Sequence, residues 1–530
     1  MSSFGSSVDD YELSLSRRQT LGATLWRSAS AWPDAPAVTH ADESVTQPYR
    51  ELNAWVNRTA AGLARKGVWK GSRVAVVMRN RIEFVHLYYA LAKLGAVIVP
   101  LNFRLLPDEL GTLIRHAQCH HLIVDPPAAE TLKVDVDWGV KSRIVAGGAS
   151  PGWEPLAAIT TDQPSEEWQS DVTESDVLGF MYTAGTTGLP KASIKTHGEY
   201  AFSAQSFLLR LARFLDVGPR TAYLANTPIF HGGGFTLAAM AIHAGWHTIM
   251  ISAFTPERFV EAVQRYRPSI TWLVPTMLTV CLKSGVAAEA MAPLKVIISA
   301  GAPLPPSLRE EAQRAWPHVP ILDVLGQTEA CGPITAPDSI DVIRRKPTTL
   351  GKPLLGVEIA VQSLDGKPLA AGEWGEVCYR GPLISQGYYR NPDATITAFR
   401  DQWFHSGDIG YLDADGDLYL VDRLGDMMIT GGENVFPSEV EDILLSHPAV
   451  AEACVFGLPD QVWGDLIAAA VVRRAGAEVS AEELMGHCRE RLAAFKCPRS
   501  IFFRAALPKS PIGKILRREA RQTAIAESAR

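Results

Sequence analysis

Cysteine is scarce in this chain, which has seven cysteines among 530 residues. Their number is odd, and no two of them have the CxxC spacing of redox and zinc-binding motifs. Small secreted folds that depend on disulfides carry cysteines at much higher density. Ser16-Arg17-Arg18 resembles the start of a twin-arginine export signal, but Arg27 interrupts the apolar stretch that such a signal requires. We therefore expect a reduced, cytoplasmic protein.

Long uninterrupted apolar segments are also missing. Residues 221–256 contain no Lys, Arg, Asp or Glu, but Pro228 and three consecutive glycines, Gly232, Gly233 and Gly234, break the segment. A membrane helix needs about 20 continuous apolar residues. We therefore expect no membrane span. The segment is interpreted as a strand, a glycine loop, a helix over Phe235–Ala244 and a strand over Thr248–Ile251.

An excess of positive charge is absent, because 51 basic and 57 acidic residues give a net charge of −6. This balance argues against a broadly basic nucleic-acid-binding protein. The charge is uneven near the end of the chain. Residues 425–484 have two basic and eleven acidic side chains, whereas residues 485–530 have eleven basic and three acidic ones. The basic segment suits a domain that closes over anionic ligands.

Strands and amphipathic helices alternate from Tyr49 to about Val324, which is the pattern of sheets covered by helices. From Gly351 to Leu420, short strands and tight turns predict a small β unit. We expect an α/β fold with a large N-terminal domain, residues 1–424, made of two α/β subdomains and a small β subdomain. A small, mobile α+β C-terminal domain, residues 425–530, should follow. The predicted strands include Arg73–Met78, Ala96–Pro100, His121–Val124, Thr221–Ala225, Thr271–Val274 and Lys295–Ser299.

Three alternating acidic residues, Asp413, Asp415 and Asp417, hint at a calcium loop. Gly416 and Leu424 do not occupy the positions that the glycine and the final glutamate of such a loop require. We interpret this stretch as a hairpin turn.

The strongest motif runs from Tyr182 to Lys191, with the sequence YTAGTTGLPK, and follows the apolar stretch Val177–Met181. It therefore predicts a loop that leaves a strand. Threonine hydroxyls and glycine N–H groups can surround a polyphosphate, and a lysine adds positive charge. The GxxxxGK[ST] spacing of a Walker loop is absent. The residues predicted to bind phosphate are Thr183, Gly185, Thr186, Thr187, Gly188 and Lys191.

Together with other segments, this motif resembles the AMP-forming adenylating enzymes, the superfamily of acyl-CoA synthetases, luciferases and peptide-synthetase adenylation domains. Tyr49–Asn53, Leu94–Val97 and Val99–Asn102 are similar to its N-terminal signatures. Further matches follow in the expected order over nearly the whole chain. The resemblance implies ATP, Mg²⁺ and a small-molecule carboxylic acid as ligands.

The resemblance assigns roles to three segments of the N-terminal domain. The segment ending in His231 resembles the one whose histidine lies between the acyl pocket and the adenylate. The segment Leu325–Glu329 resembles an aromatic-Gly-x-Thr-Glu motif, in which Thr328 would contact the α-phosphate and Glu329, with Thr186, would bind Mg²⁺. Leu325 replaces the aromatic residue that stacks on adenine. The residues implied on the adenine side are Ser299, Gly301, Ala302, Pro303, Leu325 and Gly326.

Four segments near the C-terminus complete the resemblance. Asp408 occupies the position of the ribose-binding carboxylate, which can accept hydrogen bonds from both ribose hydroxyls. Arg423 should reach the nucleotide, and Gly425 occupies the hinge pivot. Lys514 resembles the catalytic lysine that bridges the substrate carboxylate and the α-phosphate. The loop implied to line the channel for the pantetheine arm of CoA contains Gly431, Gly432, Glu433 and Asn434.

These assignments predict an ATP-dependent acyl-CoA synthetase with two half-reactions, adenylation and transfer of the acyl group to the CoA thiol. The acyl pocket should come largely from the uncharged segment around 231–239, so that no cation is expected there for a second carboxylate. The three glycines should leave room for an apolar aryl, cyclic or medium-chain acid. The predicted pocket residues are His231, Gly232, Gly233, Gly234, Phe235, Gly301, Gly326 and Gln327.

Two alternative functions share parts of this prediction. An amide-forming ligase would share the acyl adenylate but use an amine or amino acid as the acceptor. A non-catalytic adenylate-binding protein is disfavoured by Lys514, Glu329 and the intact threonine loop. The sequence leaves a homodimer open.

Overall fold

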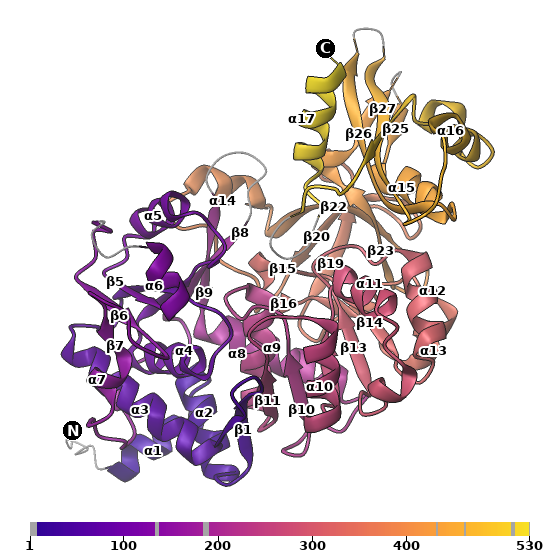
Figure 1. The fold of residues 1–530 in the computed structure, drawn as a ribbon. Helices are drawn as coiled ribbons and strands as arrows, with labels where there is room; N and C mark the ends of the chain where they lie inside the picture. The colour runs from indigo at the N-terminus through magenta and orange to yellow at the C-terminus, as the bar shows by residue number, and fades with distance from the viewer. Residues whose placement is uncertain are drawn as a thin grey trace.

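A computed structural model of the protein describes residues 8–132, 137–183, 190–430, 433–460, 463–509 and 515–528. Two seven-stranded sheets lie side by side in the N-terminal domain, a five-stranded sheet follows them, and another five-stranded sheet forms the C-terminal domain at the top of Figure 1. The predicted α/β fold class is confirmed. Among the described residues, no helix is both long and apolar enough to cross a membrane.

The first large sheet has the strand order β7-β6-β5-β3-β4-β8-β9 and is parallel except for the antiparallel pair β8–β9. Its strands are short and rich in Val and Ile, and most of their residues are buried, as expected for strands covered by helices. The strands are β3 (Arg73–Val77), β4 (Val97–Pro100), β5 (His121–Val124), β6 (Ser142–Val145), β7 (Glu154–Pro155), β8 (Val177–Thr183) and β9 (Lys191–Thr196).

The second large sheet has the order β14-β13-β12-β10-β11-β1-β2 and is parallel except for the pair β1–β2. Its strands are β1 (Pro36–His40), β2 (Val45–Pro48), β10 (Ala222–Ala225), β11 (His247–Met250), β12 (Ile270–Trp272), β13 (Val296–Ser299) and β14 (Ile321–Asp323). The strands predicted from the sequence are therefore present in both sheets, with ends that differ by at most two residues.

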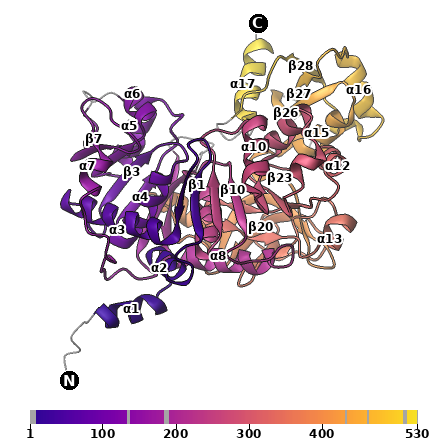
Figure 2. The same cartoon turned by 60° about the horizontal axis from the view of Figure 1, so that its bottom comes forward.

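Helices cover both sheets, and one helix pair joins them (Figure 2). Helix α8 (His197–Leu211) contacts β9 of the first sheet, α9 (Gly232–His243) contacts β10 and β11 of the second, and the two helices pack on each other. A single hydrophobic cluster accordingly contains residues of both sheets, among them Ile98 and Ile298. The other N-terminal helices are α1 (Val8–Arg17), α2 (Leu21–Ala31), α3 (Tyr49–Arg65), α4 (Ile82–Leu94), α5 (Pro107–His116), α6 (Pro126–Leu132), α7 (Leu156–Thr160), α10 (Pro256–Tyr266), α11 (Pro275–Lys283), α12 (Pro306–Ala315), α13 (Ile340–Arg345) and α14 (Pro392–Ala398).

The predicted small β unit is the sheet β19-β20-β22-β21, with β23 paired to β22. Its strands are β19 (Glu358–Gln362), β20 (Gly375–Arg380), β21 (Phe399–Arg400), β22 (Trp403–Leu412) and β23 (Leu418–Arg423). The acidic stretch is the turn between β22 and β23, as predicted. The Nζ of Lys346 lies 2.6 Å from Asp413, 2.7 Å from Asp415 and 2.6 Å from Asp417, so an ammonium group holds the centre of this cluster.

The C-terminal domain is built on the sheet β25-β24-β27-β26, with β28 paired to β27. Its hydrophobic clusters contain no residue of the N-terminal domain in the described part of the chain. All seven cysteines are unpaired and buried. The elements of this domain are β24 (Met428–Thr430), β25 (Glu433–Val435), β26 (Val450–Asp460), β27 (Gly464–Arg473), β28 (Ser500–Arg504), α15 (Pro437–Ser446), α16 (Ala481–Arg489) and α17 (Arg517–Ser528).

Candidate active site

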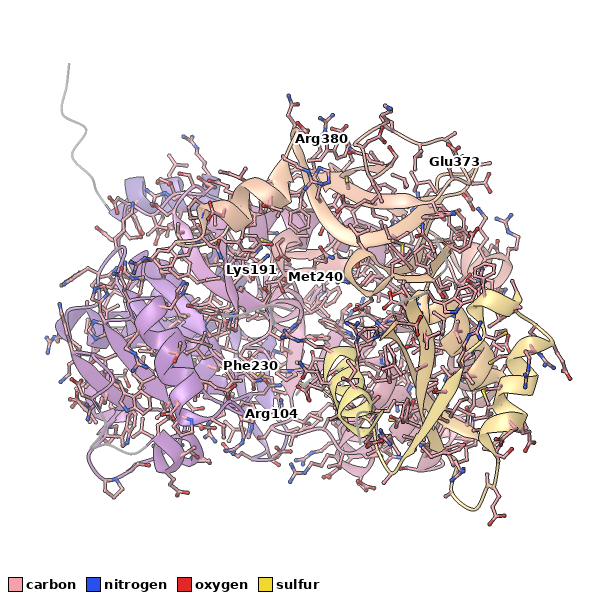
Figure 3. The ribbon with its side chains drawn as sticks, turned by 90° about the horizontal axis from the view of Figure 1, so that it is seen from above. Arg104, Lys191, Phe230, Met240, Glu373 and Arg380 are labelled. Carbon is pink, nitrogen blue, oxygen red and sulfur yellow. The ribbon has the colours of Figure 1, made fainter. Side chains whose placement is uncertain are left out.

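The polar residues singled out from the sequence lie mainly where strands end. Thr183 is the last residue of β8, Lys191 is the first of β9, and Ser299 ends β13. Ligands of open α/β sheets bind outside the carboxyl ends of the strands. Seen from above, Lys191 and Phe230, the residue before His231, lie near the middle of the view, whereas Arg380 at the end of β20 lies toward its edge (Figure 3).

The predicted phosphate loop is anchored by an antiparallel pair of residues. Thr183 and Lys191 are partners in the β8–β9 ladder, and the Thr183 hydroxyl donates to the Lys191 carbonyl at 3.4 Å. The loop between them contains Gly185, Thr186, Thr187 and Gly188, which lie outside the described residues. The register nevertheless fixes the two ends of the loop and brings the lysine back beside the threonine.

Lys191 and Glu329 are linked through a tyrosine that sequence reasoning missed. The Nζ of Lys191 lies 5.2 Å from the centre of the Tyr388 ring, and the Tyr388 hydroxyl donates to Oε1 of Glu329 at 2.7 Å. Burial, reinforced by the Glu329 carboxylate, raises the pKa of Tyr388, which keeps this hydroxyl a donor. Glu329 is 8% exposed and belongs to the short turn Thr328–Ala330. Its buried carboxylate is the type of oxygen ligand that Mg²⁺ prefers, so the residue fits the ion.

Asp408 lies in a chain of strong hydrogen bonds. Both of its carboxylate oxygens have partners: Nε of Arg423 at 2.5 Å and Nε2 of Gln327 at 2.5 Å. The Tyr379 hydroxyl donates to Oε1 of Gln327 at 2.6 Å and thereby fixes the amide orientation. Asp408 is 3% exposed, whereas Arg423 is 46% exposed on its side chain. Gln327, which was predicted in the acyl pocket, instead directs its side chain to the carboxylate predicted to bind ribose.

His231 begins helix α9, and its Nδ1 accepts from the Gly233 N–H at 3.4 Å. Burial lowers its pKa, so the imidazole is neutral near pH 7. The helix starts at Gly232 and not at Phe235 as predicted, which places the three glycines in its first turn. A neutral ring acceptor can satisfy an N–H group at a helix start, and this cap explains the earlier beginning.

The glycines of this turn make room for protein atoms. A Cβ at Gly233 would lie 2.0 Å from the Trp272 ring, and one at Gly234 would lie 2.2 Å from the Pro228 carbonyl oxygen. Only Gly232 faces more open space, with Thr328 at 3.9 Å. The expectation that all three glycines open the pocket is therefore wrong for Gly233 and Gly234, because Trp272 and the backbone fill that space. Phe235 is also packed, with its ring 3.9 Å from that of Tyr88 and 4.7 Å from that of Tyr200.

On the predicted adenine side, Gly301 has a φ of +88°, a conformation that glycine adopts without strain. A Cβ there would lie 3.8 Å from Val274 and 4.0 Å from Trp272. The Trp272 ring thus packs against Gly233 and lies near Gly301, a contact that sequence reasoning missed. Leu325 is buried, Ala302 is half-buried and Pro303 is exposed. Gly326 permits the close β15–β16 pairing of Gly326–Gln327 with Gly332–Pro333, since its Cβ would lie 2.8 Å from the Gly332 carbonyl oxygen.

The C-terminal residues of the predicted site are more open. Glu433 and Asn434 lie exposed on β25, while Gly431, Gly432 and Lys514 lie outside the described residues. Both ends of the segment around Lys514 are placed, because Lys509 and Ile515 pair as an antiparallel bridge. Gly425 belongs to the turn Leu424–Asp426, and a Cβ there would meet no atom within 4 Å.

One arginine connects the turn Leu424–Asp426, the predicted hinge, to the C-terminal domain. Arg517 pairs with Asp426 at 2.5 Å and with Glu441 at 2.8 Å, and it donates to the Val455 carbonyl at 2.9 Å. Burial raises the pKa of Glu441, and Arg517 opposes this shift. On the other side of the hinge, the Ser438 N–H donates to Oδ2 of Asp422 at 2.8 Å.

Comparison with known proteins agrees with this geometry. Residues 25–389 match the family model described as AMP-binding enzyme, and residues 439–514 match the AMP-binding enzyme C-terminal domain. The chain is 34% identical over 507 residues to the long-chain-fatty-acid–CoA ligase FadD13 of Mycobacterium tuberculosis, covering 94% of this chain and 97% of the relative.

Solved structures show the same architecture. ATP-bound MatB from Rhodopseudomonas palustris superposes with a TM-score of 0.87 at 28% identity, covering 96% of this chain and 99% of that chain. The amide bond synthetase McbA from Marinactinospora thermotolerans superposes with a TM-score of 0.83 at 26% identity, covering 95% and 99%. The motifs, the two domains and these likenesses agree, and the chain belongs to the AMP-binding enzyme family, in its branch of AMP-forming acyl-CoA synthetases, which use ATP, Mg²⁺ and CoA.

Proposed function

We propose that this protein activates an apolar carboxylic acid with ATP, releases pyrophosphate, and transfers the acyl group from the resulting acyl-AMP to the thiol of CoA. One observation supports this most directly: the junction of the sheets brings a cation, Lys191, and a buried carboxylate, Glu329, to the two sides of Tyr388. Such a pair can hold phosphate oxygens and a divalent cation side by side.

In the first half-reaction, a carboxylate oxygen of the acid attacks the α-phosphorus of ATP, and the bond to the β-phosphate oxygen breaks. Lys191 and the loop from Thr183 to Gly188 hold the phosphates, and Thr328 contacts the α-phosphate. Glu329 and Thr186 would hold Mg²⁺, which supplies positive charge against the phosphate oxygens. Lys514 bridges the two anions, whose mutual repulsion otherwise opposes the attack.

The nucleoside is oriented by the hydrogen-bonded chain around Asp408. Gln327 and Arg423 hold both carboxylate oxygens, so the side chain is placed before the ribose arrives. The adenine lies along Ser299 to Pro303 and Leu325. His231 separates the nucleotide from the acyl group, and its neutral ring can accept a hydrogen bond without repelling a cation.

In the second half-reaction, the CoA thiol attacks the acyl carbon, and AMP leaves. The face occupied by Lys514 must then be vacated. The C-terminal domain rotates about Gly425, and the loop Gly431–Asn434 enters to line the path of the thiol. The open surroundings of Gly425 support this role, because no neighbouring atom opposes a change of backbone conformation there.

The acid is compact and apolar, an aryl, cyclic or medium-chain acid. Trp272 supports this assignment because its ring fills the space beside Gly233 and approaches Gly301. A flat wall favours a ring that can stack against it.

An amine acceptor is the second candidate, because the amide bond synthetase McbA has the same fold at a TM-score of 0.83. The test is a panel of acids with purified protein, in which pyrophosphate release and thioester formation are measured with CoA or with an amino acid. CoA-dependent thioester formation is expected. Pyrophosphate release without a thioester, together with an amide product when an amino acid is added, would contradict the CoA assignment.

A further inference from the structure

Lys195 is the most unusual buried charge beside the site. It lies on β9 with an exposed fraction of 0%, and its Nζ has no oxygen acceptor among the described residues; the weakly accepting Cys331 thiol is its neighbour. A buried ammonium group without an acceptor is costly, by several kcal/mol in general. An acceptor from outside the chain would remove this cost.

Lys195, Glu199 and Ser203 form a small cluster of buried polar side chains, called the chamber below. Glu199 and Ser203 lie one turn apart on α8, and both are buried. The Ser203 hydroxyl also has no hydrogen-bond partner among the described residues, and the Cys331 thiol donates to Oε2 of Glu199 at 3.6 Å. Burial raises the pKa of Glu199, and the Thr196 N–H and the charge of Lys195 oppose this shift. Lys195 and Glu199 are therefore close enough to interact, although they form no direct ion pair among the described contacts.

The chamber lies next to the predicted acyl site. Thr236 is one turn beyond Gly232 on α9, and its hydroxyl donates to the Gly232 carbonyl at 2.8 Å and to the Cys331 carbonyl at 2.6 Å. A Cβ on Gly332 would lie 2.6 Å from the Ser203 hydroxyl and 2.8 Å from Thr236. The Ser203 hydroxyl and the Thr236 side chain therefore pack directly against Gly332, which places Ser203 beside the helix that carries Gly232. One helical turn is about 5.4 Å, roughly the length of an aromatic ring, so a ring near Gly232 would reach the chamber.

The chamber's donors and acceptors select one kind of group. Lys195 can only donate, ionised Glu199 can only accept, and Ser203 can do both. A hydroxyl oxygen can accept from Lys195 and donate to Glu199 at once. A second carboxylate would instead be repelled by Glu199 and could donate nothing to it.

We propose that Lys195, Glu199 and Ser203 bind a hydroxyl group at the far end of the acyl substrate, so that the protein prefers hydroxylated aryl acids to the same acids without a hydroxyl. The proposal rests on the proposed function and narrows its substrate class. It departs from the expectation that no cation lies near the acyl pocket, because Lys195 comes from a strand outside the uncharged segment.

The test measures discrimination within pairs of acids. Benzoic acid is compared with its 3- and 4-hydroxy forms, cinnamic acid with 4-hydroxycinnamic acid, and both with terephthalic acid. The readouts are acid-dependent pyrophosphate release without CoA and equilibrium binding of the acids in the presence of AMP. The hydroxylated acid of each pair is expected to be favoured by about tenfold or more, since a site built for a hydroxyl disfavours the analogue without it. Terephthalic acid should be the weakest ligand.

Substitutions then test whether the preference for hydroxylated acids depends on the chamber residues. Lys195→Met and Ser203→Ala should each bring the preference for the hydroxylated acid over the unhydroxylated acid of a pair toward a ratio of one. Ser206→Ala is the matched control: it removes a hydroxyl from the same helix that donates outside the chamber, to the Leu355 carbonyl at 2.9 Å, and it should keep the ratio. Thermal unfolding of each variant without ligand is measured beside the wild type, so that a loss of the preference can be told apart from a loss of folding.

Three results would overturn the proposal: a wild type that binds both acids of each pair equally, a Lys195→Met variant that keeps the full preference, or a water that still bridges Lys195 and Ser203 in an acid-bound crystal structure. Because neither readout requires CoA, these results are independent of the acceptor. Failure to form a thioester would contradict only the proposed function.

Discussion

The two domains hold their predicted functional residues in different ways. In the N-terminal domain, Glu329 and Asp408 are buried, and each accepts a hydrogen bond of 2.7 Å or shorter from a neighbouring side chain. In the C-terminal domain, Glu433 and Asn434 lie exposed on β25. The first arrangement is preorganised for charge, whereas the second would acquire its partners if the domain moves as proposed. One pocket can thus support two reactions if only one of its sides is rigid.

The largest effect that distinguishes the roles of the two domains is expected for Lys514→Ala. Adenylation should fall by about 10²–10³, as for the loss of one group that stabilises transition-state charge. Thioester formation from synthetic acyl-AMP should remain close to wild type, because Lys514 has left the site by then. Single-turnover measurements of pyrophosphate and thioester formation separate the two steps.

Lys509→Ala is the matched control for this prediction. It removes the same charge five positions away, where Nζ contacts Glu452 at 2.8 Å, and both half-reactions should persist. If Lys514→Ala adenylated every accepted acid at the wild-type rate, its assigned role would be wrong.

The next effect concerns the hinge. Gly425→Pro should slow the thioester step by about 10²-fold, because misplacement of the moving domain by about 1 Å costs that much, while adenylation changes less. Gly425→Ala should retain both steps, since a Cβ at this position meets no atom within 4 Å. Equal losses of both half-reactions in Gly425→Pro would argue against a hinge at this residue.

A smaller effect is expected for Tyr388→Phe in the rigid domain. The variant loses one hydrogen bond to a charged carboxylate, which is worth about 1.5–3 kcal/mol, so the KM for MgATP should rise at least about tenfold. Tyr389→Phe serves as the control, because that hydroxyl donates to Gln118, away from Glu329, at 3.0 Å. An unchanged KM for MgATP in Tyr388→Phe would separate Tyr388 from nucleotide binding.

The smallest effect expected for a single residue is on the pH dependence of folding stability, which should differ between the two domains. Burial lowers the pKa of four histidines to about 4: His86, His197, His243 and His247. The pKa of His121 is also lowered to about 4, because nearby cationic side chains add to the effect of burial. All five belong to the N-terminal domain. Because these folded-state values lie below the unfolded value near 6.5, the unfolded chain binds more protons as the pH falls. The stability that neutral histidines contribute is therefore present above pH 6.5 and is lost toward pH 4.

Urea unfolding at pH 7 and pH 5, followed by tryptophan fluorescence, measures this loss. Twelve of the 13 tryptophans precede residue 425, so the signal reports mainly on the N-terminal domain. Each histidine contributes up to about 1.4 kcal/mol per pH unit. Equal free energies of unfolding at the two pH values would contradict the assignment of these histidines as buried and neutral.

Local patterns predicted the framework well, because the signal for a covered strand lies within the strand itself. His121–Val124 has the bounds predicted from its apolar residues, and the hairpin at Asp413–Asp417 follows from its turn residues. The start of α9 was missed because it depends on the His231 ring as a cap, which a count of glycines does not reveal.

The site was less predictable, since its partners are distant in the sequence. Tyr388 is 59 residues from Glu329, and Tyr379 is 52 residues from Gln327. Trp272 reaches Gly233 from another strand, and Lys195 looks like any strand lysine until its burial is known. The strand KASIKT is mostly polar, so no local pattern in it marks Lys195 as buried. The roles of Gly185–Gly188, Gly431, Gly432 and Lys514 stay predictions.

The ion pairs of Arg517 have a mechanical consequence. Arg517 is three residues beyond Lys514, and its partner Asp426 is the residue after Gly425. Arg517 therefore links the turn that contains Gly425 to the helix that follows Lys514 in the sequence, and Glu441 is its second carboxylate partner. If the domain rotates about Gly425 as proposed, these ion pairs would make the turn and the helix move together, so that Lys514 would leave and the thiol channel would arrive in one concerted motion.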